Sequence, residues 1–281
     1  MFRARANRNS VRRVAKQLLS NPRLGDPGIA FPAGLVLTIV ISLSNRKLCR
    51  VRRRNGFWEY RWSIGSFADF NRSPRPSITP EDPTGYSEIF FWEYEPRLND
   101  VVVDIGSGLG EELFALRTRV GPGGEVFGFE AHPATFAKLG WVRELNDWSN
   151  VHIFQAAVVD ASGPVYISDN EEYESNNLFS SGSYEVEGIA LDDFASQQGI
   201  SHIDYIKVNI EGAEVLALQG MEAVARLTDH LCISCHDFLG TDWGRTSERV
   251  RSWLESKGFR VLDRPDDPRP WVRFYLYGVK P

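Results

Sequence analysis

A run of alternating glycines follows an apolar segment in the middle of the sequence. The segment is Val101–Ile105, in which Asp104 is the only charged residue, and Gly106, Gly108 and Gly110 come directly after it. Glycines at such a turn let the backbone approach a ligand closely, and a carboxylate at a strand end can accept hydrogen bonds from a ligand's amine. The motif therefore predicts a small-molecule site between a strand and the following helix.

The spacing of these glycines bears on the kind of ligand. A dinucleotide-binding loop has its last glycine three residues after the second, whereas here Gly110 follows Gly108 by two, and Glu111 stands where a pyrophosphate would be repelled. Twenty residues after Gly110, Glu130 ends the next apolar segment, where a carboxylate can bind both hydroxyls of a ribose. The pattern favours a nucleoside ligand over a nicotinamide or flavin cofactor. A plain strand-to-helix turn is the alternative.

Polar residues also end two later strands. Asn209 and Glu211 end one of them, and His236 and Asp237 follow the next. Ligands of open α/β sheets lie outside the carboxyl ends of the strands, so these four residues are the candidate catalytic groups. His236 is expected to be the general base because its ordinary pKa is near 6.5, with Asp237 orienting it. Two alternatives stay open: a structural histidine, or a divalent cation held by Glu211, His236 and Asp237.

These residues need a scaffold of alternating strands and helices, which the sequence predicts from Asp100 onward. Strands are expected at residues 101–105, 126–130, 151–155, 203–210 and 230–235, helices at 111–120, 133–147, 213–226 and 246–257, and a closing hairpin at 259–262 and 274–277. This order predicts a doubly wound α/β sheet with right-handed crossovers. An acidic insertion between residues 162 and 188 interrupts it, and its polar residues are expected to form a solvated loop.

The N-terminal part has a different organisation. Residues 49–63 are expected to form a hairpin, because Asn55-Gly56 supplies the positive φ angles of a tight turn. Four prolines between residues 73 and 83 indicate a linker. We therefore expect a basic N-terminal extension over residues 1–83 and a second domain over residues 84–281.

The composition is globular, with 42% hydrophobic and 25% charged residues and a net charge of −5. Residues 1–75 carry a charge of +13 and the remainder −18, so a basic arm precedes an acidic body. The overall acidity argues against nucleic acid as the main partner. Three cysteines do not make a secreted disulfide framework, so a cytoplasmic location is expected.

Residues 27–45 contain no charged side chain. A membrane-spanning helix needs about 20 mostly apolar residues, and two prolines and two glycines interrupt the first half of this segment. We expect either a buried strand or helix of the N-terminal part, or peripheral contact with a membrane surface. The basic clusters on both sides, Arg12-Arg13 and Arg52-Arg53-Arg54, would favour an anionic leaflet.

Four blocks together resemble the FkbM family of S-adenosylmethionine-dependent methyltransferases. They are Val101–Gly110, Phe129-Glu-Ala-His-Pro133, Leu191-Asp-Asp193 and Asp204-Tyr-Ile-Lys-Val-Asn-Ile-Glu-Gly-Ala-Glu214, of which the end of the last is the most family-specific. The similarity runs from about residue 86 to 278. It implies a Rossmann-like sheet of seven mostly parallel strands with an antiparallel C-terminal hairpin.

The resemblance also implies roles for individual residues toward S-adenosylmethionine. The methionine end would lie at the glycine loop, the ribose at Glu130 with His132 beside it, and the adenine near Ala156 and Ala157. The loop residues are Asp104, Gly106, Ser107, Gly108 and Gly110. Asn209 stands where many relatives carry Asp, which leaves an ionised group or metal ligand at that position in doubt. The implied reaction is O-methylation of a sugar or of a glycosylated or natural-product acceptor.

Two alternative hypotheses assign the protein to functional classes other than methyltransferases. A binding module would keep the nucleoside pocket without catalysis, and Asn209 is the residue that hints at it. Cys232-Ile-Ser-Cys235-His236 has the form of a covalent haem attachment site of an electron carrier. Positions 232 and 235 of a strand point to opposite faces, however, so two buried strand cysteines explain the motif better.

Overall fold

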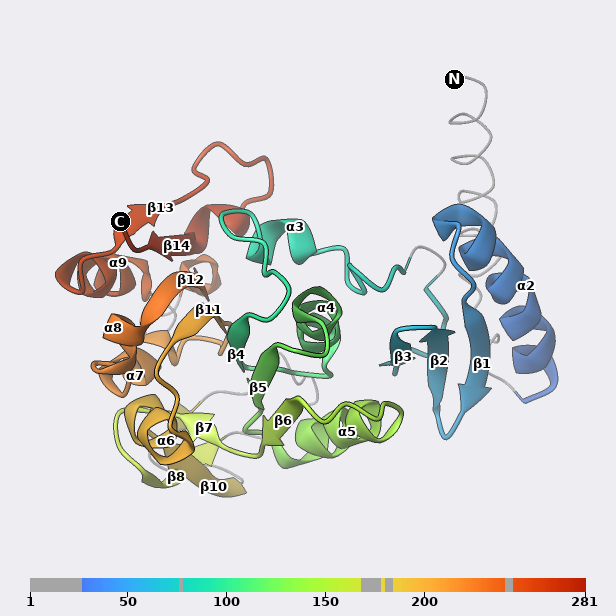
Figure 1. The fold of residues 1–281 in the computed structure, drawn as a ribbon, viewed down its shortest axis with the longest axis horizontal. Helices are drawn as coiled ribbons and strands as arrows, with labels where there is room; N and C mark the ends of the chain where they lie inside the picture. Colours follow the sequence, from blue (N-terminus) through green and yellow to red (C-terminus); the bar gives the residue numbers. More distant parts are fainter. Residues whose placement is uncertain (1–26, 76–77, 168–177, 180–183, 241–244) are drawn as a thin grey trace. The chain divides into compact units, whose positions relative to one another are not determined.

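The computed structural model describes residues 27–75, 78–167, 178–179, 184–240 and 245–281 (Figure 1). The basic clusters before residue 27 and the acidic segment 169–177 therefore lie outside the described residues. The chain divides into two compact units. The first comprises Met1–Tyr86 and Trp141–Asp147, and the second comprises Ser87–Gly140 and Trp148–Pro281.

The first unit contains a three-stranded antiparallel sheet of β1 (Arg50–Arg54), β2 (Phe57–Trp62) and β3 (Gly65–Asp69), in that order. The predicted hairpin is confirmed, since β1 and β2 pair in register around Asn55 and Gly56, whose φ angles are 47° and 84°. Two positive φ angles in succession match the twist of the flanking strands. β3 was not predicted.

The uncharged segment 27–45 forms a helix, α2 (Pro27–Asn45). Its inner face buries Ala30, Ala33, Leu37 and Ile41. Thr38 Oγ1 accepts a hydrogen bond from the Val51 amide at 2.9 Å, and Ser42 Oγ accepts one from the Cys49 amide at 2.9 Å. α2 thereby occupies backbone donors at the outer edge of β1, which would otherwise be open to pairing with another chain.

The outer face of α2 is apolar and exposed. Phe31, Leu35, Ile39 and Leu43 recur every four residues and are 84%, 58%, 54% and 71% exposed. Such spacing places them on one stripe of the helix. Among the described helices, none is both long and apolar enough to cross a membrane.

The second unit is built on a seven-stranded sheet in the order β13-β14-β12-β11-β4-β5-β6. Its strands are β4 (Val101–Ile105), β5 (Glu125–Phe129), β6 (Val151–Phe154), β11 (Ile203–Val208), β12 (Thr228–Ser234), β13 (Arg260–Leu262) and β14 (Tyr275–Val279). β12, β11, β4, β5 and β6 run parallel, and β14 is antiparallel to both β12 and β13. The predicted doubly wound sheet with an antiparallel C-terminal hairpin is confirmed. The strand order reverses between β4 and β11, where such sheets bind ligands.

The helices of this unit are α3 (Ser87–Phe90), α4 (Glu111–Val120), α5 (Pro133–Glu144), α6 (Leu191–Gln198), α7 (Glu214–Gln219), α8 (Val224–Leu227) and α9 (Ser247–Ser256), with 3-10 turns at Asp237–Leu239 and Val272–Phe274. The long helix expected over 213–226 is two short ones. They separate at Gly220, where a Cβ atom would lie 2.0 Å from the carbonyl oxygen of Val159. Close backbone approach therefore requires glycine between α7 and α8.

The inserted segment after β6 adds a small second sheet. Its strands are β7 (Ala157–Val158), β8 (Gly163–Ile167), β9 (Leu178–Phe179) and β10 (Tyr184–Ile189), in the order β7-β10-β8-β9. This sheet differs from the solvated loop expected between residues 162 and 188. Short strands within a polar insertion give little hydrophobic alternation to detect.

The two cysteines of the haem-like motif lie in separate parts of the core. Cys232 packs in the cluster that contains Val102 and Tyr205, and Cys235 packs in the cluster that contains Ile105 and Val208. Both thiols are free and buried, and burial raises the pKa of Cys232 to about 12. Their side chains are therefore core residues on opposite faces, as the strand period predicts.

Candidate active site

The glycine loop joins the end of β4 to α4. Gly106, Gly108 and Gly110 have φ angles of 78°, 54° and 85°, which L side chains rarely adopt. The amides of Gly106 and Ser107 both donate to the carbonyl oxygen of Phe129 at 2.9 Å. A Cβ atom on Gly106 would lie 2.0 Å from the carbonyl oxygen of Asn209. The loop thus passes tightly between the ends of β5 and β11.

Glu130 follows β5 and contacts this loop directly. Its Oε2 accepts a hydrogen bond from the Gly108 amide at 2.9 Å, and its Oε1 accepts one from the His132 amide at 2.9 Å. Burial raises the pKa of Glu130 to about 7, against the opposing effect of these two bonds. Each carboxylate oxygen has a further lone pair, so the group can still accept hydrogen bonds from the two hydroxyls of a ribose.

Asp104 is completely buried beneath the loop and is paired with a lysine that the sequence analysis missed. Lys207 Nζ lies 2.9 Å from Asp104 Oδ1 and donates to the Gly106 carbonyl oxygen at 2.7 Å. Burial lowers the pKa of Lys207, but the carboxylates of Asp104 and Glu112 outweigh it and raise the pKa overall. Asp104 therefore supports the loop through Lys207. The sequence contained one sign of this pair, because Lys207 is the only lysine in β11, a strand of mostly buried residues.

The charge around the loop is negative on balance. Glu112 lies in the first turn of α4, and burial raises its pKa, with Glu111 and Asp104 acting in the same direction and Lys207 opposing them. A single lysine, Lys207, is therefore outnumbered by three carboxyl groups, those of Asp104, Glu112 and Glu130. Such a site favours a cationic ligand and repels a pyrophosphate. Glu112 was also missed, because its sequence position suggested only a helix N-terminus.

The remaining expected ligand residues lie at the same edge of the sheet. Ala156 and Ala157 follow β6 and are buried. His132 is largely buried, with Nδ1 3.4 Å from Thr135 Oγ1, and its ring meets Tyr184 edge-on at 5.4 Å. Because β5 and β6 are parallel neighbours, these residues and Glu130 share one carboxyl edge.

A second cluster centres on His236, which follows β12. Its Nδ1 lies 2.8 Å from Glu214 Oε1, and its Nε2 lies 3.3 Å from Glu211 Oε2. Glu214 is fully buried and also accepts hydrogen bonds from the Thr246 hydroxyl at 2.9 Å and the Gly212 amide at 2.9 Å. Glu214 therefore holds the histidine ring from behind, while Glu211 lies on its outer side.

The two carboxylates determine the protonation of His236. A neutral imidazole has one N–H, so both ring nitrogens can donate to carboxylates only when the ring is protonated. Burial lowers the pKa of His236, but Glu211 and Glu214 outweigh it and raise the pKa to about 10. His236 is an imidazolium at neutral pH. This differs from the expectation of a free-base histidine, because a protonated ring cannot accept a proton.

Glu211 has the properties of a reactive group. Its side chain is 24% exposed, and its φ of 53° is unusual for a residue with a side chain. Such strained backbone is concentrated at functional sites. Asn209, which donates its amide to the Ile105 carbonyl oxygen at 3.0 Å, precedes it and touches Gly106. Asn209 and Glu211 thus connect the glycine loop with the histidine cluster.

Asp237 does not orient His236. Its Oδ2 accepts hydrogen bonds from the amides of Thr246 and Ser247 at 3.2 and 3.0 Å, and its Oδ1 accepts one from the Ser247 hydroxyl at 2.6 Å. Asp237 caps α9 instead, which satisfies amides at the helix N-terminus.

The cation site expected at Glu211, His236 and Asp237 does not fit this geometry. Asp237 directs its carboxylate to the N-terminus of α9, and both ring nitrogens of His236 are already paired with carboxylates. Within the described ranges, one group of three side chains has ligand atoms within 4.8 Å of one another, namely His202, Asp204 and Asp229. They lie at the opposite, amino ends of β11 and β12, where His202 forms ion pairs of 3.2 and 3.6 Å with the two carboxylates.

Comparison with known proteins places this arrangement in a family. The sequence model of the methyltransferase FkbM domain matches residues 100–261. "Methyltransferase 1" of Beauveria bassiana (strain ARSEF 2860) is 26% identical, over 75% of this chain and 95% of that protein.

Solved structures were compared as well. An FkbM methyltransferase from Methylobacillus flagellatus KT is 18% identical with a TM-score of 0.49, over 72% of this chain. This chain spans only 48% of that protein's length. Fibrillarin from Aeropyrum pernix, in complex with S-adenosylmethionine, is 12% identical with a TM-score of 0.44, over 82% of this chain and 97% of that one. Because the matched domain covers more than half of the sequence, including the glycine loop, Glu130 and Glu211, the chain belongs to the FkbM methyltransferase family.

Proposed function

We propose that this chain uses S-adenosylmethionine to methylate a hydroxyl group of a sugar or of a glycosylated natural product. The residues at the glycine loop fit this donor. Glu130 presents carboxylate oxygens for a ribose, and the excess of carboxylates over Lys207 suits a positively charged sulfonium. The observation that carries the proposal is the partly exposed Glu211 carboxylate, held by His236 at 3.3 Å beside this site.

When bound, S-adenosylmethionine would supply an electrophilic methyl carbon: the acceptor oxygen would form the new carbon–oxygen bond while the carbon–sulfur bond breaks and its electron pair stays on the sulfur of the leaving thioether. The protein must hold the acceptor hydroxyl in line and accept its proton. Glu211 is the proton acceptor in this proposal, because its carboxylate is the exposed member of the cluster. The backbone of Asn209 passes next to the loop, and in this proposal its carboxamide hydrogen-bonds the acceptor.

His236 and Glu214 are positioning residues in this scheme. The imidazolium orients Glu211, and buried Glu214 fixes the ring through the 2.8 Å contact. When Glu211 has received the proton it is neutral, and the buried Glu214 carboxylate remains as the negative partner that keeps His236 charged. This arrangement resembles other sites in which a base is oriented by a second group and that group by a third.

The competing hypothesis is a nucleoside-binding module without catalysis. Both hypotheses predict binding of S-adenosylhomocysteine, measured by isothermal titration, so the discriminating measurement is transfer of a labelled methyl group to a panel of glycans and glycosides, read by mass spectrometry. The enzyme hypothesis predicts a product heavier by one methyl group. Binding without any product across hydroxyl-bearing acceptors would support the module instead.

The role of Glu211 is tested with Glu211→Gln. We expect at least a hundredfold loss of turnover with S-adenosylhomocysteine affinity kept within about twofold, since general-base catalysis contributes about 10²–10⁴-fold. Glu248→Gln, on the exposed surface of α9, is the charge-matched control and should keep full turnover. Unchanged turnover in Glu211→Gln would remove this residue from the mechanism.

A further inference from the structure

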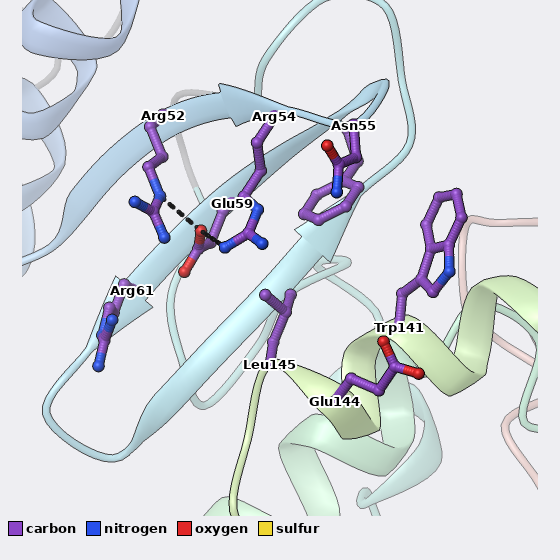
Figure 2. A pocket seen from close by; sticks show the side chains of 9 residues that line it. Arg52, Arg54, Asn55, Glu59, Arg61, Trp141, Glu144 and Leu145 are labelled. Carbon is purple, nitrogen blue, oxygen red and sulfur yellow. Dashed lines mark hydrogen bonds and ion pairs between the residues drawn. The ribbon is translucent and has the colours of Figure 1, made fainter.

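The first unit contains a pocket of about 370 Å³ that the methyl-transfer scheme does not use (Figure 2). One wall is a face of the β1–β2 hairpin, and the other is formed by residues 141–145, from the end of α5 and just beyond it. All of these residues belong to the same compact unit. A volume of this size accommodates a small organic ligand.

The hairpin collects arginines on the pocket face. Arg52 and Arg54 are two residues apart on β1, and Glu59 and Arg61 are two residues apart on β2, so each pair points to one side of the sheet. The register aligns Arg52 with Glu59. The alternation of the two strands therefore brings three arginines and Glu59 to one face, and Figure 2 shows Arg52 and Arg54 converging on the Glu59 carboxylate.

Glu59 holds two of these guanidinium groups in place. It is 2% exposed, and its Oε2 lies 2.6 Å from Arg52 Nε and 3.5 Å from Arg54 Nη1. Its Oε1 accepts a hydrogen bond from Ser66 Oγ at 3.2 Å. Burial raises the pKa of Glu59, but Arg52, Ser66 and Arg54 together lower it below its ordinary value. The Glu59 carboxylate, with its lowered pKa, thus preorganises Arg52 and Arg54.

Positive charge is left over on this face. The side chains of Arg52 and Arg54 remain 45% and 43% exposed, with guanidinium nitrogens beyond those that face Glu59. Arg61 forms no ion pair with any residue that the structure describes. The three guanidinium groups that line the pocket therefore outnumber its two carboxylates, which belong to Glu59 and Glu144. Guanidinium groups of this kind bind carboxylate and phosphate oxygens in a bidentate manner.

An aromatic surface completes the pocket. The indole of Trp141 is 40% exposed, and its ring centroid lies 5.8 Å from that of Phe57 and 5.9 Å from that of Phe70. These two rings support Trp141 from the hairpin side. A rigid, partly exposed aromatic plane offers contact area at a low cost in conformational entropy.

We propose that this pocket binds an anionic sugar. The phosphate or carboxylate group lies against Arg52, Arg54 and Arg61, the sugar ring lies against Trp141, and Glu144 accepts hydrogen bonds from ring hydroxyls. Sugar phosphates and uronic acids share this chemistry. The proposal is independent of methyl transfer, because every residue that carries it belongs to the first unit.

The test is isothermal titration of the full chain with glucose 6-phosphate and with glucuronate, compared with inorganic phosphate, acetate and adenosine 5′-monophosphate. We expect at least one sugar ligand to bind at least tenfold more tightly than the matching inorganic or simple anion. Tenfold tighter binding of glucose 6-phosphate over glucuronate, or the reverse, identifies the anionic group. The assignment is overturned if neither sugar ligand binds more tightly than its matching simple anion, if the nucleotide binds more tightly than both sugars, or if no sugar ligand binds.

Two variants locate the binding. Arg61→Gln and Trp141→Ala should each weaken binding of the preferred sugar at least tenfold. Arg249→Gln, which removes the same charge from the exposed face of α9, is the matched control and should bind normally. Thermal melts identify any variant that fails to fold, and Arg61→Gln is the safer of the two because its side chain is exposed. Unchanged affinity in a folded Arg61→Gln protein overturns the proposed site.

Discussion

The Nδ1 atom of His236 lies 2.8 Å from Oε1 of Glu214, a carboxylate that is completely buried. The two residues are 22 positions apart and meet at the carboxyl edge of the sheet. The contact turns a residue that could serve as a base into a fixed cation. The same contact makes the protonation of His236 the most direct measurement of the site.

The pKa of His236, about 10, lies above its unfolded value of 6.5. Its interactions therefore stabilise the fold fully below about pH 6.5, and that stabilisation is lost as the pH rises toward 10. We expect an NMR titration of the His236 ring to show a protonated imidazole at pH 8. The extra stability of the wild type over His236→Gln, measured by urea unfolding, should shrink between pH 7 and 10. A ring that titrates below pH 7 would contradict the doubly paired histidine.

Glu130 should make donor binding sensitive to pH. Its pKa is raised to about 7, so the carboxylate that accepts ribose hydrogen bonds is lost as the pH falls below that value. We expect the affinity for S-adenosylhomocysteine to fall about tenfold between pH 8 and pH 6, by titration calorimetry. Glu130→Gln should bind weakly with a nearly flat pH dependence. An equally steep dependence in that variant would assign the effect to another group.

Gly106→Ala tests the tight passage of the loop under Asn209. The added Cβ would lie 2.0 Å from a backbone carbonyl oxygen in a backbone conformation that costs alanine about 1–2 kcal/mol by itself. We expect loss of S-adenosylhomocysteine binding and a lowered melting temperature. The matched control is Gly140→Ala in α5, where an added Cβ has no neighbour within 4 Å. That change should be neutral or stabilising by up to about 1 kcal/mol.

Lys207→Met should destabilise the second unit strongly. It leaves Asp104 buried without its cation, and breaking a buried pair in this way costs about 3–5 kcal/mol. The double variant Asp104→Asn with Lys207→Met removes both charges and should recover most of that loss. Urea unfolding of the two single variants and the double variant measures the coupling. Additive effects would mean that the pair contributes nothing to stability.

The outer stripe of α2 predicts peripheral binding to an anionic membrane surface. Leu35 and Leu43 are 58% and 71% exposed, and Arg46 follows at the end of the helix, before Lys47, which is paired with Glu81. Burial of such a stripe at a lipid interface is favourable, and basic neighbours add attraction to anionic headgroups. We expect co-sedimentation with vesicles containing phosphatidylglycerol. Leu35→Glu with Leu43→Glu should abolish it, whereas Leu98→Glu, at another exposed leucine, should not.

Local patterns were sufficient to predict the strands and the residues at their ends. The apolar runs predicted β4, β5 and β11, and the position of Glu130 after β5 followed from them. The partners of the site residues were not predictable in this way. Lys207 meets Asp104 across neighbouring strands, and Thr246 reaches Glu214 from 32 positions away. Only the folded chain brings such residues together.

The direction of Asp237 shows the same limit. In the sequence it stands next to His236 and could orient it, but the amides of Thr246 and Ser247 compete for its carboxylate. A helix N-terminus has unsatisfied amides, so the Asp237 carboxylate binds these amides and does not bind the His236 ring. β3 was missed for a related reason, because its five residues, Gly-Ser-Phe-Ala-Asp, lack the alternation that reveals a strand.

The hydroxyl groups of Thr38 and Ser42 have a consequence for handling the protein. They occupy the amides of Cys49, just before β1, and of Val51 within it, and without them this edge of the hairpin would be open to pairing with strands of other chains. A shortened protein that starts after α2 would lose the exposed apolar face of this helix. It would nevertheless be more prone to self-association, because the edge of β1 would be uncovered.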